Sequence, residues 1–501
     1  MSGHGQCKVA TATIMGTEAI PVEVQVDVGP GLPSFHLVGL GDTAVQEARE
    51  RVRSALRASG YTFPNARIVV NLAPSPLRKH GTGFDLPIAA GILVATGQLS
   101  PQSIDGAHLA GELSLDGGLR SVPGLLAHLI GARDCLKTFI GPTQATKYAS
   151  SLPGINYIPI SSLRALDPKK RPTHIHEQGT AIRSDSCSLD LADIAGHDLA
   201  RRALIVSAAG NHNIMFVGPP GSGKTMLAKR LAGLFPDLTP RESLETALLY
   251  SVAGFDEELY LAGKRPFRAP HHSCSLTGLV GGGVPLRPGE ISLAHNGVLF
   301  LDEMTHFAPS ALQSLRQPLE DGVITLVRAE GRISYPAQFT LVAASNPCPC
   351  GYAGDFQHPC KCPPQVIDRY MNRIGGPLID RIDLNLRIDR VDPSRFFSGA
   401  QGVSTAQART AVMSAREVAL RRDGCLASRL SGKQLHRSCD LTESAEGRLL
   451  DFAAKQHLSG RAITKILRVS RTVADIANVQ RVDTEHILEA TVYRSTTGAQ
   501  S

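Results

Sequence analysis

The stretch that decides the fold of this 501-residue chain is Gly218-Pro219-Pro220-Gly221-Ser222-Gly223-Lys224-Thr225. It follows an apolar strand predicted for Asn213–Val217 and opens a helix predicted for Met226–Leu234. In this setting the pattern is a phosphate-binding loop, because its glycines let backbone N–H groups close around phosphates at a helix N-terminus. The motif predicts ATP and Mg²⁺ as cofactors, with Lys224 on the β- and γ-phosphates and Thr225 on the metal. The nucleotide-binding residues are therefore predicted to be Gly218, Gly221, Ser222, Gly223, Lys224 and Thr225.

Two further apolar strands end in the polar residues that ATP hydrolysis requires. Gly297–Leu301 leads into Asp302, a ligand for Mg²⁺, and Glu303, a base for the attacking water. Phe339–Ala344 leads into Asn346, whose amide can orient that water. Short strands alternate with helices from Leu189 to about Arg387, which is typical of a parallel sheet. The sequence predicts an α/β nucleotide-hydrolysing core with Lys224, Asp302, Glu303 and Asn346 as catalytic residues.

These motifs, in this order, resemble those of AAA+ ATPases. The resemblance implies that Arg381 is an arginine finger, which stabilises transition-state charge at the nucleotide of a neighbouring subunit. Arg373 is a second candidate, and the alternative for Arg381 is a surface arginine paired with Asp380 or Asp383.

The resemblance also implies a sensor 2 arginine in the helical region. Ser459-Gly460-Arg461 opens a predicted helix there, so Arg461 is the expected sensor 2 residue. Arg468 and Arg471, further along the helix, are less favoured candidates.

Three more motifs narrow the family. They are Phe267-Arg268-Ala269-Pro270-His271-His272-Ser273, Leu286-Arg287-Pro288-Gly289-Glu290-Ile291 and Asn346-Pro347-Cys348-Pro349-Cys350-Gly351. Together with the phosphate-binding loop they resemble the ComM (YifB) family of magnesium-chelatase-like AAA+ ATPases, nearly end to end. The resemblance implies a bacterial homo-hexameric ring and a helicase that promotes branch migration of DNA in homologous recombination during natural transformation. The implied partners are single-stranded or branched DNA and other copies of the chain.

Two insertions in the predicted core carry arginines. One is the glycine-rich segment Leu276–Gly289, expected to be a mobile loop that carries Arg287. The other is a predicted hairpin, Val323–Ser334, with Arg328 and Arg332. Basic loops near a ring axis can grip phosphates without reading bases, so all three arginines are candidate DNA contacts. The alternative is that these segments pack against other parts of the ring.

Four of the ten cysteines form two C-x-C pairs, Cys348/Cys350 and Cys360/Cys362. Four thiolates in so short a segment can surround one tetrahedral Zn²⁺. His358 is an alternative ligand, and the competing interpretation is a loop of reduced thiols. A zinc ion here would be structural.

The N-terminal region resembles the proteolytic domain of Lon, an α+β fold of the ribosomal S5 domain 2-like type. Lon requires a serine activated by a lysine, and Asp85 and His128 stand at those positions here, so we expect a proteolytically inactive domain. Thr82 lies nearby but lacks a lysine partner at the expected place. By analogy with a related branch-migration ATPase, this domain could extend a basic DNA channel through Arg51, Arg53, Arg57, Arg78, Lys79 and His80.

Composition sets the remaining expectations. The formal net charge of +7, from 52 Lys+Arg against 45 Asp+Glu, permits nucleic-acid contact without requiring it. The sequence lacks a signal-peptide pattern and an apolar stretch of membrane-spanning length, so a cytoplasmic protein without a membrane partner is expected.

The predicted domains are the Lon-like domain (1–166), a linker (167–188), the AAA+ core (189–390) and a C-terminal helical lid (391–501). The alternative function is a chelatase-type AAA+ motor that remodels a protein partner.

Overall fold

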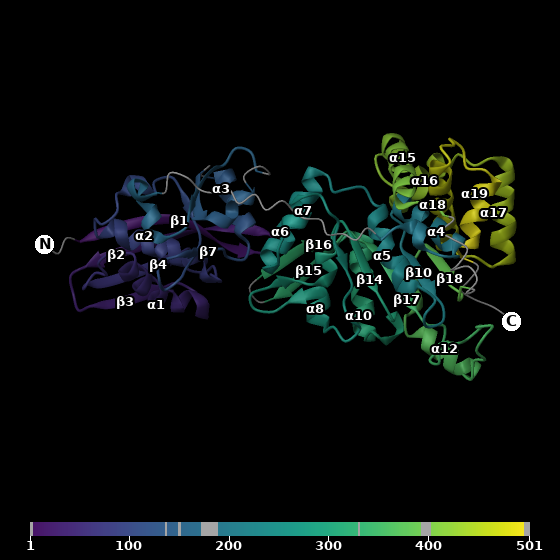
Figure 1. Cartoon of the computed structure of the whole chain (residues 1–501), viewed down its shortest axis with the longest axis horizontal. Coiled ribbons are helices and arrows are strands. Elements are labelled where there is room, and N and C mark those ends of the chain that lie inside the picture. The colour runs from purple at the N-terminus through teal and green to yellow at the C-terminus, as the bar shows by residue number, and fades with distance from the viewer. Residues whose placement is uncertain are drawn as a thin grey trace.

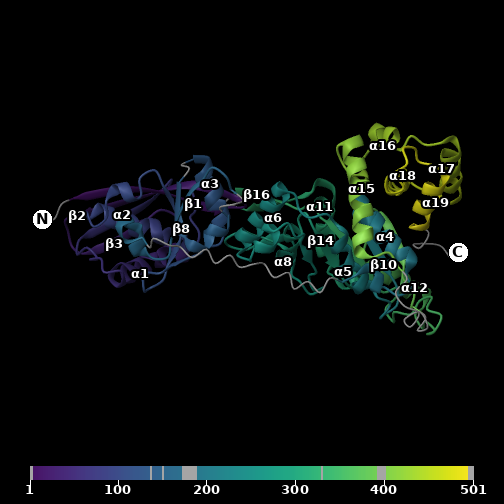
Figure 2. The same ribbon diagram turned by 45° about the horizontal axis from the view of Figure 1, so that its top comes forward.

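Three parts of the chain lie in a row in the computed structural model (Figure 1). A sheet domain stands at the N-terminal end, the nucleotide-binding core lies in the middle, and a helical domain stands at the far end. The turned view in Figure 2 keeps this order. The structure describes residues 4–135, 138–148, 152–171, 189–328, 331–391 and 402–494. Most of the predicted linker (172–188) and the side chain of Arg328 lie outside the described residues.

The N-terminal domain is built on a seven-stranded mixed sheet in the order β3-β4-β2-β1-β5-β8-β9. Alternate valines of β2, from Val22 to Val28, are buried against helices, as the period of a half-buried strand requires. Asp42 caps the first helix by accepting a hydrogen bond from Val45 N. The strands are β1 (Gly5–Met15), β2 (Glu18–Gly29), β3 (Ser34–Val38), β4 (Arg67–Ala73), β5 (His108–Leu109), β8 (Thr138–Pro142) and β9 (Asn156–Ile160), and the helices are α1 (Thr43–Ala58), α2 (Asp85–Ala95) and α3 (Leu125–Cys135).

The residues at the protease positions of this domain have other partners. Asp85 is fully buried and ion-paired with Arg51, its Oδ2 lying 2.7 Å from Arg51 Nε. Burial raises the pKa of Asp85 to about 6, although Arg51 opposes the shift. His128 Nδ1 lies 3.1 Å from His108 Nε2, and the Thr82 hydroxyl donates to Glu112. None of these pairs is a hydroxyl with an amine that could activate it.

Two of the basic residues expected at a DNA channel are not available for it. Lys79 is fully buried and donates to the carbonyl of Pro74. Arg51 is held by Asp85. The expectation that Lys79 contacts DNA was wrong, since its side chain is buried. Lys79 stands just before a glycine in the sequence, and nothing in the neighbouring residues indicates that its side chain is buried.

The core sheet is parallel throughout, in the order β11-β14-β17-β10-β18. The strands expected from the sequence are confirmed, and their buried side chains pack under helices on both faces. The strands are β10 (Ile214–Val217), β11 (Phe267–Arg268), β14 (Val298–Leu301), β17 (Thr340–Ser345) and β18 (Leu384–Arg387), and the helices include α4 (Asp198–Gly210), α5 (Lys224–Leu234), α6 (Pro240–Ala253), α10 (Pro309–Ser314), α11 (Arg316–Asp321), α12 (Pro364–Asn372) and α13 (Gly376–Ile379).

The glycine-rich insertion is more ordered in form than expected. It contains the helix α8 (Leu276–Val280) and a hairpin in which β12 (Gly281–Gly282) pairs antiparallel with β13 (Arg287–Pro288), followed by α9 (Glu290–Leu293). Leu279 is fully buried in the core. The sequence predicted a loop, and this segment instead contains a short helix and a two-stranded hairpin.

The second insertion is the predicted hairpin, and it is confirmed. Its strands are β15 (Val323–Arg328) and β16 (Gly331–Pro336), paired antiparallel. Ile333 packs against Gly16 of the N-terminal domain. A Cβ atom added to Gly16 would lie only 2.7 Å from the Cγ2 methyl group of Ile333. Leu286 and Arg287 line a pocket together with Thr82 and His128. Both insertions therefore face the N-terminal domain.

A direct contact joins the N-terminal domain to the core. Gly124 N donates to Ser251 O at 2.7 Å, and Leu126 N donates to Ser251 Oγ at 3.3 Å. Lys147 Nζ lies 2.8 Å from Glu257 Oε1.

The C-terminal domain is helical, as expected. Its helices are α15 (Thr405–Asp423), α16 (Gly432–Cys439), α17 (Glu443–Lys455), α18 (Gly460–Ile476) and α19 (Thr484–Val492). Buried residues of α15 and α18 join those of α4 and α5 in one core. No helix among the described residues combines the length and the apolar character that a membrane crossing requires.

Candidate nucleotide site and subunit surface

The phosphate-binding loop lies where three parallel strands end at one edge of the sheet. Val217 of β10 is level with Ser345 of β17. Thr225 Oγ1 donates to Asp302 Oδ2 at 2.8 Å, so the two expected Mg²⁺ ligands are already adjacent. This oxygen pair suits Mg²⁺, which is usually held by few protein oxygens together with substrate phosphates.

The side chain of Lys224, which is expected to bind the nucleotide phosphates, lies within the phosphate-binding loop. Its Nζ donates to Gly218 O at 2.7 Å and Pro219 O at 2.9 Å, and approaches Asn346 Oδ1 at 3.3 Å. Burial lowers the pKa of Lys224. Ser222 Oγ is buried without a hydrogen-bond partner among the described residues. A bound phosphate would supply acceptors to both side chains, so the residues present fit ATP.

Glu303 lies next to Asp302 but at the mouth of the site. Its backbone adopts the left-handed conformation, with φ of 49°. Its carboxylate lies between His272 and His306, and both imidazole Nδ1 atoms are within 3.5 Å of Oε2. The sequence analysis did not predict this histidine pair, although His272 belongs to one of the quoted motifs.

Arg381 lies at the opposite edge of the sheet from the phosphate-binding loop. It precedes β18, whose first residue, Leu384, is level with Ile214 at the start of β10. Its carbonyl accepts a hydrogen bond from Asn213 Nδ2 at 2.9 Å. A four-residue strand spans about 13 Å, so Arg381 is remote from the nucleotide site of its own chain.

The partner of Arg381 differs from the expected alternatives. Its guanidinium pairs with Glu320 of α11, not with Asp380 or Asp383. Asp383 instead faces His212, whose Nδ1 lies 3.0 Å from Oδ2.

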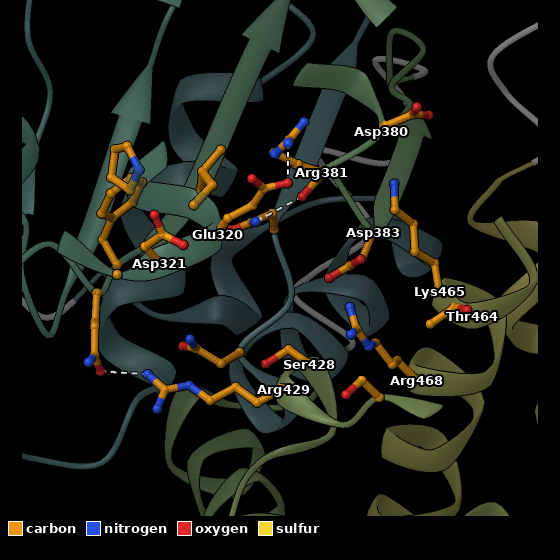
Figure 3. Close-up of a pocket in the computed structure, with 18 of the residues that line it drawn as sticks. Glu320, Asp321, Asp380, Arg381, Asp383, Ser428, Arg429, Thr464, Lys465 and Arg468 are labelled. Atoms are coloured by element: carbon orange, nitrogen blue, oxygen red, sulfur yellow. Dashed lines mark hydrogen bonds and ion pairs between the residues drawn. The ribbon is translucent and has the colours of Figure 1, made fainter. Parts of the chain in front are cut away.

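Arg381 and Arg461 line one pocket of about 690 Å³ between the core and the helical domain. Figure 3 shows Arg381 and Glu320 pointing toward each other, with Lys465 and Arg468 of α18 on the other side of the pocket. Burial lowers the pKa of Lys465 to about 8. The pocket brings arginine and lysine side chains together with the carboxylates of Glu320, Asp321, Asp380 and Asp383.

The other arginines considered for these roles differ in exposure. Arg373 is exposed at the end of α12. Arg471 is fully buried and donates to carbonyls of Ser438, Val479 and Gln480. Arg471 therefore holds the helical domain together and cannot reach a nucleotide.

Comparisons with known proteins agree with this architecture. Three magnesium chelatase family models match the chain: "Subunit ChlI of Mg-chelatase" at residues 24–145, "Magnesium chelatase, subunit ChlI" at 190–396 and "Magnesium chelatase, subunit ChlI C-terminal" at 402–494. Competence protein ComM of Haemophilus influenzae is 42% identical over 490 residues, covering 96% of each chain. The chain belongs to the ComM (YifB) family. The YifB protein of Escherichia coli is 41% identical over 495 residues, covering 97% of this chain and 96% of that one.

Membership of the ComM family fixes the broad activity. A magnesium chelatase-type AAA+ domain implies an ATPase that uses ATP and Mg²⁺. The Magnesium-chelatase 67 kDa subunit of Chlorobaculum parvum is 28% identical over 159 residues, which are 31% of this chain and 23% of that one. That similarity is confined to a minor part of both chains.

The cysteine cluster of this ComM-family chain has the geometry of a zinc site. The four Sγ atoms all lie within 4.8 Å of one another. Cys348 Sγ is 3.3 Å from Cys350 Sγ and 3.7 Å from Cys360 Sγ, close to the ~3.8 Å that separates ligands in a tetrahedral Zn–thiolate centre. Hydrogen bonds from the backbone of Tyr352 and Lys361 lower the pKa of Cys350 to about 6, which favours the metal-binding thiolate.

The cluster also contacts the nucleotide site. A Cβ on Gly351 would lie 2.7 Å from Pro220 Cδ of the phosphate-binding loop. Arg387, at the end of β18, donates to carbonyls of Ala353 and Gly354. A zinc ion held by these cysteines would brace the phosphate-binding loop from outside.

We expect the purified protein to contain about one Zn²⁺ per chain. Replacing Cys350 and Cys362 by serine should remove the metal and weaken ATP binding, because Gly351 and Pro220 then lose their fixed contact. Metal analysis and nucleotide titration check both effects. Cys135→Ser, at an exposed cysteine of the N-terminal domain, should change neither. Full zinc content in the double variant would contradict the assignment.

Proposed function

We propose that this ComM-family ATPase is a homo-hexameric DNA motor that promotes branch migration in homologous recombination. The observation that carries the proposal is the placement of the two insertions. Both face the N-terminal domain, and both present an exposed arginine, Arg287 and Arg332. A hexamer would repeat these cations around one axis, where they could hold a phosphate backbone without reading its bases.

A trans-acting arginine supports assembly into a ring. Arg381 cannot serve the nucleotide of its own chain, so it needs a neighbour whose phosphate-binding loop faces it. Arg461 shares its pocket, and we assign it the sensor 2 role on the same neighbouring nucleotide. Hydrolysis would then take place between subunits, and the state of one nucleotide would control the contact between two chains.

A role in natural transformation is supported by one relative's name, Competence protein ComM. Imported single strands recombine through branched intermediates, and these are the substrates that a branch-migrating motor moves. In this scheme the N-terminal domain is a proteolytically inactive, Lon-like platform. The buried pairing of Asp85 with Arg51 supports that assignment, because the residue at the nucleophile position is committed to an ion pair.

The direct test uses a synthetic three-way DNA junction with homologous arms. The protein should convert it to duplex products only with ATP and Mg²⁺. Arg287→Ala and Arg332→Ala should each weaken junction binding and make the negative slope of log K against log salt shallower by about 0.9 for each phosphate contact that is lost. Arg421→Ala, at an arginine paired with Glu417 on the surface of α15, should leave both unchanged. Intact junctions after many ATP turnovers would contradict the proposal.

The second candidate is a chelatase-type motor that remodels a protein partner. The observation in its favour is the set of magnesium chelatase family models that match the chain. This candidate predicts ATP hydrolysis that no form of DNA stimulates. Measuring ATP hydrolysis of the same purified protein with and without DNA therefore distinguishes the two functions.

A further inference from the structure

The backbone on both sides of Arg381 is held by a lysine of the helical domain. Lys465 of α18 is buried, and its Nζ donates to Ile382 O at 3.0 Å and to Ile379 O at 3.5 Å. These carbonyls bracket Arg381, where the chain has left α13 and has not yet entered β18. Figure 3 shows the side chain of Lys465 extended toward this segment. The lysine therefore fixes the turn that carries the proposed arginine finger.

Lys465 contacts these carbonyls as a charged donor. Burial lowers the pKa of Lys465 to about 8, while Asp383 and Asp380 favour the ammonium, so the side chain carries its charge at neutral pH. Hydrogen bonds from a charged donor are roughly twice as strong as those between neutral groups. Because an ammonium has three donor protons, it can hold two carbonyls at once. The contact thus resists displacement of the segment around Arg381.

A second contact joins α18 to the same segment through a buried histidine. His212 Nε2 lies 2.8 Å from Thr472 Oγ1 of α18, and His212 Nδ1 lies 3.0 Å from Asp383 Oδ2. All three of these side chains are buried. Asn213, the next residue along the chain, donates to Arg381 O at 2.9 Å. The position of Arg381 is therefore set by the helical domain as well as by the core.

The same helix carries Arg461, the arginine assigned to the sensor 2 role. Arg461 and Lys465 are one helical turn apart on α18, so they lie on one face of the helix, about 6 Å apart along its axis. Both residues line the pocket that contains Arg381. Lys465 thus links the two arginines that would meet the nucleotide of a neighbouring subunit.

We propose that Lys465 is a positioning residue that holds Arg381 and Arg461 in one fixed arrangement toward the nucleotide of the neighbouring subunit. The inference rests on the proposed action of Arg381 between subunits. A rotation of the helical domain carries Lys465 with it, so the arginine finger follows the helical domain of its own chain. Hydrolysis at one interface then depends on the helical domain of the subunit that supplies the arginine.

Replacing Lys465 by methionine keeps the length of the side chain but removes its donors. Displacement of a catalytic group by about 1 Å can cost about 100-fold in rate, so Lys465→Met should lower kcat by about 10- to 100-fold. The affinity of the same chain for ATP should not change, because Lys465 lies with Arg381 at the opposite edge of the sheet from its own phosphate-binding loop. Lys465→Arg should recover most of the kcat, because a guanidinium can donate to both carbonyls.

The experiment measures kcat and the Kd for ATP on the full chain, for each variant alone and in mixed rings. Mixing Lys465→Met with Lys224→Ala should raise turnover, because some interfaces then combine an intact phosphate-binding loop with an intact Lys465. Mixing Lys465→Met with Arg381→Ala should not, since both changes affect the same side of the interface. In one chain, adding Lys465→Met to Arg381→Ala should not lower the rate further. Lys455→Met, at an exposed lysine of α17, is the matched control and should leave every value unchanged.

Three outcomes would overturn the inference. The first is a wild-type kcat in Lys465→Met. The second is a loss of kcat that comes with weaker ATP binding or that adds to the effect of Arg381→Ala, because either result would indicate a general structural role. The third is an equal loss in Lys465→Arg and Lys465→Met, since donation to the two carbonyls would then not matter. Failure of the proposed action between subunits looks different, because Arg381→Ala itself would then keep near-wild-type turnover.

Discussion

Replacing Arg381 by alanine is expected to lower ATP turnover by about 10³- to 10⁵-fold, the usual contribution of an arginine finger. The affinity of the same chain for ATP should change little, because Arg381 lies across the sheet from its own phosphate-binding loop. Arg381→Lys should rescue poorly, since an ammonium cannot present two parallel donors to a phosphoryl group. Single-turnover hydrolysis and nucleotide titration separate the two effects.

A mixing experiment tests whether Arg381 acts between subunits. Arg381→Ala and Lys224→Ala should each be nearly inactive alone. Mixed rings should recover activity, because some interfaces combine an intact phosphate-binding loop with an intact arginine. Arg421→Ala, at an exposed arginine that pairs with Glu417 on α15, serves as the control and should retain wild-type turnover. Near-normal activity of Arg381→Ala, or no recovery on mixing, would show that Arg381 is not the finger.

The second large effect is expected at Glu303. Glu303→Gln should lower kcat by about 10²- to 10⁴-fold, as loss of a general base does. ATP binding should remain, because Thr225, Asp302 and Lys224 are unchanged, so the variant should accumulate as an ATP-bound assembly. Size measurement with ATP, together with turnover, checks both points. Glu446→Gln, at an exposed carboxylate on α17, is the matched control, and substantial hydrolysis by Glu303→Gln would remove Glu303 from the catalytic role.

The nucleotide site was largely predictable because its information is local. Glycines, an apolar strand and a following helix specify the phosphate-binding loop within one short segment. Parallel strands end at a common edge, so Asp302 and Asn346 were expected beside Lys224, and Lys224 Nζ indeed lies 3.3 Å from Asn346 Oδ1. The hairpin at Val323 and the helical C-terminal domain were predictable for the same reason, since their hydrophobic periods are continuous.

What escaped prediction depends on contacts between distant segments. Glu320 is the partner of Arg381 although three strands and two helices separate them along the chain, and nearby Asp380 and Asp383 were the natural expectation from the sequence. The burial of Lys79 and the approach of His272 to Glu303 are also long-range contacts. A sequence shows which residues carry charge, but only tertiary packing decides which opposite charge each one meets.

The central claim, an ATPase that serves a DNA motor, is tested most directly by ATP hydrolysis of the purified protein. The rate is measured alone and with single-stranded, duplex and forked DNA, and Glu303→Gln provides the blank. We predict strong stimulation by single-stranded or forked DNA that is absent in the variant. Robust hydrolysis that responds to no form of DNA would contradict the motor and would direct attention to a protein partner.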